Sequence, residues 1–290
     1  MAESPAEPPF LRIGPEAPLS PVVLSVPHAG RSYSPALLSA SRLARETLET
    51  LEDRLVDRLV WRAVAGGARA VVALRPRAEI DLNRDEREID GAMIAPPPPS
   101  RSLMQSPKTR GGLGLVPSRI TGAGAIWLER LPGKELARRI AEVHRPYHAT
   151  LAEMLEQARA QFGIAILLDC HSMPPRRALN GVAEAGVVLG DRHGTSISHD
   201  LLLAAAEAAR ECGFEVAHNE PYAGGYITQR HGRPHQGTHA LQIEVDRASY
   251  LDPALRAPGP GFDQTARMIA AVSSALAGRA LEPPQAIAAE

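Results

Sequence analysis

The sequence predicts an α/β fold in which a mostly parallel central sheet is flanked by helices. Two observations lead to this prediction. Short runs of aliphatic and β-branched residues recur along the chain, as is typical of strands buried on both faces. Segments with helical periodicity lie between these runs, and strands that alternate with helices form βαβ units. At 290 residues the chain is long enough to bury a substantial core.

We expect a single domain over residues 1–290, because the strands on both sides of each irregular segment fit one sheet. Residues 1–20 are expected to form an N-terminal extension and residues 278–290 a C-terminal tail. The predicted strands are the apolar runs Val22–Val26, Ala70–Leu74, Ile164–Leu168, Gly186–Leu189, Phe214–Ala217 and Ala240–Val245.

Helical periodicity is found in the segments between these runs. In the first of them, leucines recur at spacings of three and four, which is typical of an amphipathic helix. The second contains Pro146, which is expected to kink the helix or split it in two. The predicted helices are Glu46–Val64, Lys134–Gln161, Thr195–Cys212 and Phe262–Leu276.

Two long segments interrupt the alternation of strands and helices. Residues 75–132 contain four consecutive prolines and several glycines, and residues 218–238 are rich in Gly, His and Tyr. Segments of this length inside a compact domain are usually functional or disordered. We expect both to be elaborations of the domain, and the sequence leaves open whether residues 75–132 form a lid or a subunit contact.

Charge and cysteine content exclude several classes of protein. With 32 basic and 33 acidic side chains, the net charge of −1 argues against broad nucleic-acid binding. Two cysteines cannot build a disulfide scaffold, and no apolar run approaches the roughly 20 residues that cross a bilayer. We therefore expect a soluble cytoplasmic protein without a membrane partner. Ten histidines imply that any bound metal is held by histidine and carboxylate.

Histidines lie at the ends of two predicted strands, where ligands bind in open α/β sheets. His28 follows the first strand, and His171 follows the third, two residues after Asp169. An aspartate in that position can accept a hydrogen bond from the second imidazole nitrogen, as the histidines of metal sites require. The pattern is equally compatible with histidines that only satisfy hydrogen bonds at strand ends.

A catalytic zinc usually has three protein ligands, so a carboxylate must complete such a site. Asp53 and Asp57 lie one turn apart on the polar face of the first predicted helix. Arg54 and Arg58 follow them directly, so surface ion pairs explain both aspartates equally well. The residues alone do not distinguish between the two.

Glu244 alternates with apolar residues and therefore shares one strand face with Gln242 and Asp246. A glutamate held rigidly on a strand beside a metal is suited to act as a general base. Arg84 is suited to a two-pronged contact with a carboxylate or a phosphate, and Asn83 beside it supplies further hydrogen bonds. A half-exposed strand and a surface turn would account for the same residues without any catalytic role.

Five segments together resemble the N-formylglutamate amidohydrolase family and occur in that family's order. The resemblance covers nearly the whole chain. More distantly, the order His, Asp-x-Asn-Arg, Asp-x-His and Ile-Glu resembles aspartoacylases and zinc carboxypeptidases, which have a mixed sheet flanked by helices and a zinc ion bound by two histidines and a carboxylate. The segments are Ser25–Gly30, Asp81–Arg84, Leu168–Met173, Tyr222–Thr228 and Ala240–Arg247.

The resemblance implies a role for each matching residue. His28 and His171 would be ligands of one Zn²⁺ ion, and Glu244 would be the general base. Asn83 and Arg84 would bind the substrate.

The chain departs from the carboxypeptidase pattern because Arg31 stands where a third ligand, a glutamate, is expected. Asp53 best matches the aspartate of the formylglutamate family, whereas Asp57 matches a second family aspartate. The resemblance thus favours Asp53 as the third ligand. Manganese, iron or cobalt would suit the same donor atoms.

The implied activity is hydrolysis of N-formyl-L-glutamate to formate and L-glutamate, in one route of histidine degradation. A dicarboxylate substrate requires a second arginine, for which Arg233 and Arg247 are the candidates. The alternatives are a zinc amidase for another N-acyl amino acid or a peptide-like substrate, and a relative that binds ligand without catalysis. The oligomeric state is not predicted.

Overall fold

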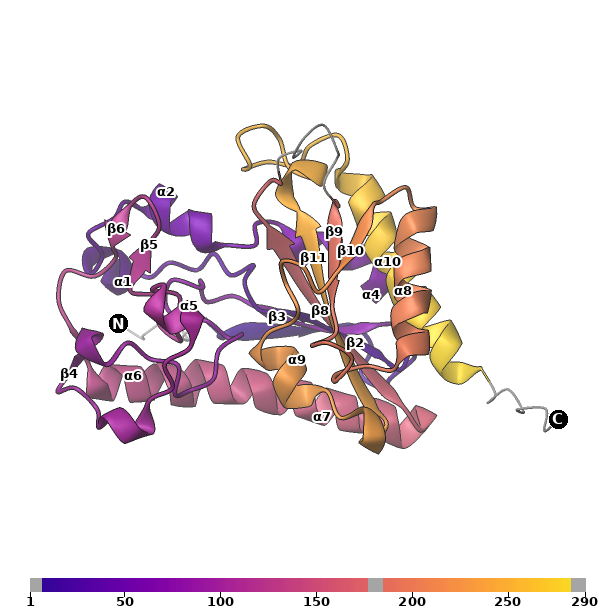
Figure 1. Ribbon diagram of the computed structural model, residues 1–290, viewed down its shortest axis with the longest axis horizontal. Coiled ribbons are helices and arrows are strands. Elements are labelled where there is room, and N and C mark those ends of the chain that lie inside the picture. Colours follow the sequence, from indigo (N-terminus) through magenta and orange to yellow (C-terminus); the bar gives the residue numbers. More distant parts are fainter. Residues whose placement is uncertain (1–6, 177–184, 283–290) are drawn as a thin grey trace, which may run out of the picture.

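The computed structural model describes residues 7–176 and 185–282, which form a seven-stranded mixed sheet with helices on both faces (Figure 1). The predicted α/β fold is therefore confirmed. The strand order is β1-β3-β2-β8-β11-β9-β10. The strands are β1 (Phe10–Ile13), β2 (Val22–Val26), β3 (Arg69–Ala73), β8 (Ala165–Met173), β9 (Val187–Gly190), β10 (Val216–His218) and β11 (Thr238–Asp246).

Strands β3, β2, β8 and β11 run parallel to one another in the middle of the sheet. At one edge β1 is antiparallel to β3, and at the other β9 is antiparallel to β11 with β10 parallel to β9. The central strands therefore end at the same edge of the sheet. Strand β1 lies within the predicted N-terminal extension, so residues 10–13 are part of the sheet; residues 1–6 lie outside the described range.

The helices pack on the two faces of the sheet. The long helix α7 (Arg145–Phe162) contacts β2, β3 and β8, whereas α10 (Phe262–Leu281) packs with α8 (His199–Glu211) on the other face (Figure 1). The shorter elements are α1 (Pro35–Ser39), α2 (Arg45–Leu48), η1 (Glu49–Leu51), α3 (Val56–Leu59), α4 (Trp61–Ala65), η2 (Gly91–Met93), β4 (Ile94–Ala95), η3 (Ser100–Ser102), α5 (Pro107–Arg110), β5 (Arg119–Ile120), β6 (Gly124–Ala125), β7 (Leu131–Pro132), α6 (Gly133–Arg139), η4 (Ile140–His144), α9 (Tyr226–His231), η5 (Pro234–Gln236) and η6 (Arg247–Ser249).

Pro146 does not break the second predicted helix. The chain continues from α6 through the π-helical turn η4 into α7, and Pro146 lies in the first turn of α7. A proline has no N–H to donate, and the wider π-helical turn directly before it replaces the regular α-helical turn that the proline would interrupt. The last helix, α10, extends to Leu281, so the first residues of the predicted tail are helical and residues 283–290 lie outside the described range.

The prediction of one helix over Glu46–Val64 is wrong. The segment is divided into four short elements, with Glu52 extended and Leu55 at φ 64°. The leucine stripe serves two cores: Leu48 packs on the α7 side of the sheet, and Leu59 packs on the α10 side. A straight helix cannot bury one stripe on both faces, so the chain crosses the edge of the sheet at residues 52–55. This crossing places Asp53 at the ends of the central strands.

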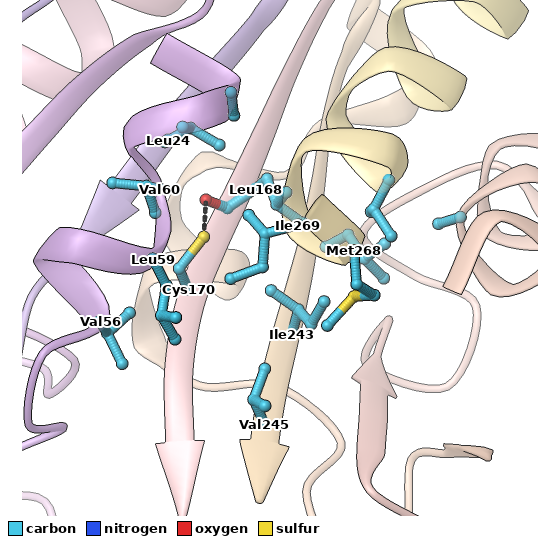
Figure 2. Packing of buried hydrophobic residues seen from close by; sticks show 14 of the residues in the cluster. Leu24, Val56, Leu59, Val60, Leu168, Cys170, Ile243, Val245, Met268 and Ile269 are labelled. Carbon is cyan, nitrogen blue, oxygen red and sulfur yellow. Dashed lines mark hydrogen bonds between the residues drawn. The ribbon is translucent and has the colours of Figure 1, made fainter. Parts of the chain in front are cut away.

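The α10 side of the sheet carries an apolar core of strand and helix side chains. Figure 2 shows Cys170 of β8 and Ile243 of β11 packed against Leu59 of α3 and Ile269 of α10. Because side chains alternate along a strand, the neighbours of Cys170 point to the opposite face. Cys170 is fully buried, and burial raises the pKa of its thiol well above the usual value. Cys170 is therefore a core residue, in agreement with a site that needs no thiolate.

The segment of residues 75–132 is built into the molecule on the α7 side of the sheet. Its residues Leu115, Ile126 and Trp127 are buried in the same core as Leu167 of β8. This explains why the segment is ordered despite its prolines and glycines. Within the described ranges, no helix combines the length and the apolar character that crossing a membrane requires.

Candidate active site

Polar residues occupy the carboxyl ends of the central strands on the face that carries α7. Parallel pairing sets Glu244 of β11 beside His171 of β8, and Gln242 beside Asp169. Toward the beginning of the same strands this face is apolar, with Leu167 and Ala240 in the core. Along this face, each of the two strands therefore changes from apolar core residues to polar residues. Asp169 and His171 lie within β8, which is longer than the predicted strand.

His28, Asp53 and His171 converge at this edge of the sheet. The Nδ1 atoms of the two histidines lie 3.2 Å apart, and Asp53 Oδ2 lies 3.2 Å from His28 Nδ1 and 3.0 Å from His171 Nδ1. All three side chains are buried, with at most 3% of their surface exposed. They are the group of residues in the described ranges whose donor atoms are arranged to hold a metal ion.

A second carboxylate orients each imidazole from behind. His28 Nε2 lies 2.7 Å from Asp81 Oδ1, and His171 Nε2 lies 2.8 Å from Asp169 Oδ2. Histidine ligands of metals typically use one nitrogen for the ion and donate the other N–H to a carboxylate. When both Nε2–H groups donate in this way, the two neutral imidazoles direct their Nδ1 lone pairs at each other and at Asp53.

Three electron-rich atoms at such short distances repel one another, and a cation between them would relieve this repulsion. Tetrahedral ligands bound at about 2.0–2.1 Å are separated from one another by roughly 3.3 Å. The separations within the cluster are 3.0 to 3.2 Å and therefore fit a metal ion of this kind. Two imidazoles and one carboxylate also leave a fourth position for water or substrate, as in catalytic metal sites.

The pKa values within the cluster reflect its need for positive charge. Burial acts to raise the pKa of Asp53, but hydrogen bonds and charge from His171 and His28 outweigh it and hold this pKa well below the usual range. Burial acts to lower the pKa of His171, but Asp169 and Asp53 outweigh it and raise this pKa well above the usual value. The carboxylates thus favour a cation at this point.

Asp57, the alternative third ligand, lies outside the cluster. Its carboxylate pairs with both terminal nitrogens of Arg31 at 3.0 and 2.6 Å. The break in the predicted helix separates the two aspartates: Asp53 belongs to the segment that crosses the sheet edge, and Asp57 belongs to α3. The backbone N–H of Asp53 also donates to the carbonyl oxygen of His28 at 3.0 Å, which ties the crossing to the end of β2.

Glu244 lies beside the cluster and faces the same cavity. Its Oε1 accepts a hydrogen bond of 2.9 Å from Gln242 Nε2, and 8% of its surface is exposed. Burial raises the pKa of Glu244 to about 7. A carboxylate with this pKa can both accept and return a proton near neutral pH, which is the requirement for a general base.

Asn83 lines the cavity and is fixed by neighbouring elements. Its Oδ1 accepts from the backbone N–H of Ile227 at 2.8 Å, which connects the loop of residues 81–84 to α9. Gly225 makes this approach possible, because a Cβ at that position would lie 2.3 Å from the Asn83 amide. Among the glycines of residues 218–238, Gly225 is therefore required by contact with Asn83.

Arg84 also lines the cavity, but much of its guanidinium is already bonded. Its Nε donates to the carbonyl oxygen of Leu113 at 2.8 Å, and its Nη1 donates to that of Asn83 at 2.6 Å. The remaining nitrogen, Nη2, lies 3.7 Å from Asp81 Oδ2. Nη2 is therefore the part of the Arg84 guanidinium that can still bind a ligand.

Of the two proposed second arginines, the structure brings only Arg247 to the cavity. Arg247 Nη2 lies 3.2 Å from Asp53 Oδ1 and 2.6 Å from the carbonyl oxygen of Glu52, so it supports the crossing segment. Arg233 does not line this cavity. Its Nη1 donates to the carbonyl oxygens of Gln229 and Gly232 at 2.8 and 2.7 Å.

Arg77 and Lys108 line the cavity but were not predicted from the sequence. Arg77 Nε pairs with Asp81 Oδ2 at 2.9 Å. The sequence carries a weak signal for each residue: Arg77 stands four residues before Asp81, and Lys108 is one of two lysines in a chain whose basic residues are otherwise arginines. Neither signal indicates which element the residue faces, because both depend on how residues 75–132 fold.

The cavity has a volume of about 420 Å³, which is near the small end of the range of about 300 to 1,000 Å³ for small-molecule sites. It combines a buried metal-type cluster, a carboxylate with a pKa near neutrality and several cationic side chains. On a mixed α/β sheet, this combination defines a hydrolase that activates water against an anionic substrate.

Comparison with known proteins identifies the family. The model of the N-formylglutamate amidohydrolase family matches residues 20–251, and the chain belongs to this family, whose members cleave amide bonds. N-formylglutamate deformylase of Pseudomonas aeruginosa is 31% identical over 239 residues, which cover 80% of this chain and 82% of that protein. The enzyme of the same name from Pseudomonas putida is 30% identical over 242 residues, with the same shares covered.

Solved structures agree with this assignment. The crystal structure of N-formylglutamate amidohydrolase from Ralstonia eutropha JMP134 superposes with a TM-score of 0.85 and 34% sequence identity, covering 93% of this chain and 97% of that chain. A structure from Agrobacterium tumefaciens shares the fold at a TM-score of 0.61 and 18% identity, covering 95% of each chain.

Proposed function

We propose that this protein hydrolyses N-formyl-L-glutamate to formate and L-glutamate, with Zn²⁺ held by His28, Asp53 and His171. The observation that carries the proposal is the convergence of two imidazole Nδ1 atoms and one carboxylate oxygen, all within 3.2 Å, beside Glu244. The substrate follows from the names of the Pseudomonas and Ralstonia relatives. Zinc follows from the donor set, because two imidazoles and a carboxylate are typical of catalytic zinc sites.

Held by His28, Asp53 and His171, a zinc ion would supply Lewis acidity for the formyl carbonyl and for water near neutral pH. Asp81 and Asp169 keep the two imidazoles in the tautomer whose Nδ1 is free. Their role is to orient the histidines and to hold the proton on each Nε2.

Glu244 moves the proton during the reaction. As water attacks the formyl carbon, a free carboxylate oxygen of Glu244 accepts the proton, and Gln242 keeps the carboxylate in place through its hydrogen bond to Oε1. The amide C–N bond then breaks, and Glu244 returns the proton to the leaving nitrogen. One carboxylate can perform both transfers because its pKa of about 7 lies close to the working pH.

Asn83, Arg84 and Arg77, which line the cavity, would bind the α-carboxylate of the substrate. Arg77 and Arg84 both pair with the carboxylate of Asp81. Asp81 in turn bonds directly to His28 of the cluster. In an N-formyl amino acid, the α-carboxylate is likewise close to the scissile amide, because both are attached to the same Cα atom. Two guanidinium groups that share a single aspartate retain positive charge for such an anion.

Formate release from N-formyl-L-glutamate by the purified protein, measured with a formate dehydrogenase assay, tests the proposal together with metal analysis. We expect about one zinc per chain and turnover that is lost on chelation and restored by zinc. Faster release from a different N-acyl amino acid would assign the protein to the broader amidases. Stoichiometric metal without turnover on any acyl amino acid would indicate a binding protein. The role in histidine degradation and the cytoplasmic location expected from the sequence belong to the same proposal.

A further inference from the structure

We propose that Lys108 binds the side-chain carboxylate of the substrate and thereby makes the site selective for acyl amino acids with an acidic side chain. This inference rests on the proposed function and concerns a residue to which neither the sequence prediction nor the relatives assign a role. Lys108 belongs to α5, a helix of four residues within the segment of residues 75–132, and it lines the same cavity as Glu244 and Arg84.

The local structure fixes the backbone of Lys108. Ser106 Oγ accepts a hydrogen bond of 3.1 Å from the backbone N–H of Thr109, and Pro107 occupies the first turn of α5. Thr109 is buried, which anchors the helix to the rest of the molecule. The backbone carbonyl of Lys108 accepts from Leu113 N–H at 2.8 Å. A rigid backbone with a free side chain suits a residue that must reach toward a ligand.

The ammonium group of Lys108 has no carboxylate partner within the described part of the chain. The ammonium group lies over the ring of Tyr222, and the ring centroid is 6.0 Å from Nζ. The arginines of the cavity differ in this respect, because Arg77, Arg84 and Arg247 each pair with an aspartate. Lys108 is thus a cation at the cavity that forms no direct ion pair within the described part of the chain, although the charges of Glu244 and Asp81 act on it.

The surroundings of Lys108 favour the arrival of an anion. Burial lowers the pKa of Lys108 and repulsion from Arg84 and Arg77 lowers it further, whereas the negative charges of Glu244 and Asp81 raise it without restoring the usual value. A carboxylate bound between these groups would remove part of this repulsion and form a charge-assisted hydrogen bond with Nζ. Tyr222 belongs to the second long segment, so the two elaborations of the fold meet across the cavity at Lys108 and Tyr222.

The order of the charged groups decides which carboxylate Lys108 receives. Asp81 contacts the cluster through His28, and Arg77 and Arg84 contact Asp81. Lys108 forms no ion pair with the cluster or with Asp81 in the described ranges, and it reaches the cavity from α5, not from residues 77–84, which carry both arginines. In an N-formyl amino acid the α-carboxylate is close to the scissile amide, and the side-chain carboxylate is separated from it by the length of the side chain. The arginines therefore fit the α-carboxylate, and Lys108 fits the distal one.

Kinetics with a matched pair of substrates test the inference. N-formyl-L-glutamine has the shape of N-formyl-L-glutamate but lacks its distal charge. For Lys108→Met we expect KM for N-formylglutamate to rise about tenfold or more with kcat little changed, because a charged hydrogen bond is lost in binding. Kinetics with N-formylglutamine should stay as in the wild type. Lys108→Arg should keep part of the preference for N-formylglutamate over N-formylglutamine. Lys134, the second lysine of the chain, lies in α6, and Lys134→Met should leave the kinetics with both substrates unchanged.

An equal loss of kcat/KM on both substrates in Lys108→Met would overturn the inference, since it would show a structural role. An unchanged ratio between the two substrates would overturn it as well. Neither result bears on the proposed function, which is tested separately by formate release from the wild-type protein and by its metal content.

A binding measurement keeps the inference testable even if the wild-type protein releases no formate from N-formylglutamate. The two lysines can be dimethylated with ¹³C-formaldehyde, which retains their charge, and Lys134→Arg assigns the resulting NMR signals. L-Glutamate, the product, should shift the Lys108 signal, and L-glutamine should shift it much less. A Lys108 signal that responds equally to both amino acids, or to neither, would contradict the assignment.

Discussion

His28 Nδ1 lies 3.2 Å from His171 Nδ1, although each ring already directs its Nε2 at a carboxylate. The two residues are separated by 143 positions in the chain, and they meet because β2 and β8 are adjacent parallel strands. Asp53 enters the same point from the segment that crosses the sheet edge. The cluster is therefore a product of strand order and of one break in a predicted helix.

Replacing the proposed base should separate metal binding from catalysis. We expect Glu244→Gln to retain zinc and to lose turnover by a factor of about 10² to 10⁴, because an amide cannot accept the proton from water. Formate release and metal content of the same preparation provide the measurement. Since Gln242 already bonds to residue 244, the variant can keep a hydrogen bond here and should fold normally. Turnover near the wild-type rate would refute the assignment of the base.

Asp53 of the crossing segment and Asp57 of α3 should behave differently. We expect Asp53→Asn to lower the zinc content strongly, because the cluster loses its negatively charged oxygen ligand. Asp57→Asn is the matched control, since it removes only a partly exposed ion pair with Arg31, worth about 0 to 1 kcal/mol of stability. Zinc titration of the two metal-free variants compares them directly. Loss of zinc from Asp57→Asn alone would reverse the choice of ligand.

Gly225 should be intolerant of even a methyl group. We expect Gly225→Ala to lower kcat/KM by about 100-fold, because the new Cβ would collide with the Asn83 amide and displace it. Gly278→Ala is the control: no atom lies within 4 Å of a Cβ there, and alanine should stabilise α10 by about 0.5 to 1 kcal/mol. Kinetics and thermal unfolding of both variants test this pair. Full activity in Gly225→Ala would show that Asn83 can move without harm.

The buried pair His148 and His231 should make the fold sensitive to acid. His148 Nδ1 lies 3.0 Å from His231 Nε2, and His148 Nε2–H donates to the carbonyl oxygen of Leu82 in the site loop at 3.0 Å. Burial, with repulsion from Arg230 and Arg233, lowers the pKa of His231 to about 3. The pKa of histidine in the unfolded chain is about 6.5. Above this pH, residue 231 is neutral in both the native and the unfolded state, so its titration does not reduce stability.

As the pH falls below about 6.5, the unfolded chain binds a proton at residue 231 that the native state refuses, so stability decreases until the pH reaches about 3. The slope from this group approaches about 1.4 kcal/mol per pH unit. Urea unfolding from pH 7.5 to 5 should therefore show a shallower pH dependence in His231→Phe than in the wild type. His193→Asn, at an exposed position, should leave the slope unchanged. Equal slopes in His231→Phe and the wild type would contradict the buried neutral state.

Much of the site could be predicted because polar residues at strand ends stand out against apolar runs. His28, His171 and Glu244 each occur next to such a run, and strand periodicity alone puts Gln242 and Glu244 on one face. The break between residues 52 and 55 could not be predicted. Helical spacing describes which residues share a stripe, but not that Leu48 and Leu59 are buried on opposite sides of the sheet.

By itself, the sequence determined the α/β class, the central strands and the residue types that can hold a metal and move a proton, because these depend on short-range periodicity and side-chain chemistry. Only the tertiary structure brought Asp53, and not Asp57, together with His28 and His171, showed that Arg247 lines the cavity, and brought Arg77 and Lys108 to it. These outcomes depend on how two long irregular segments and one crossing segment pack against the sheet. Such packing arises from contacts between residues far apart in the chain, and local sequence patterns do not predict these contacts.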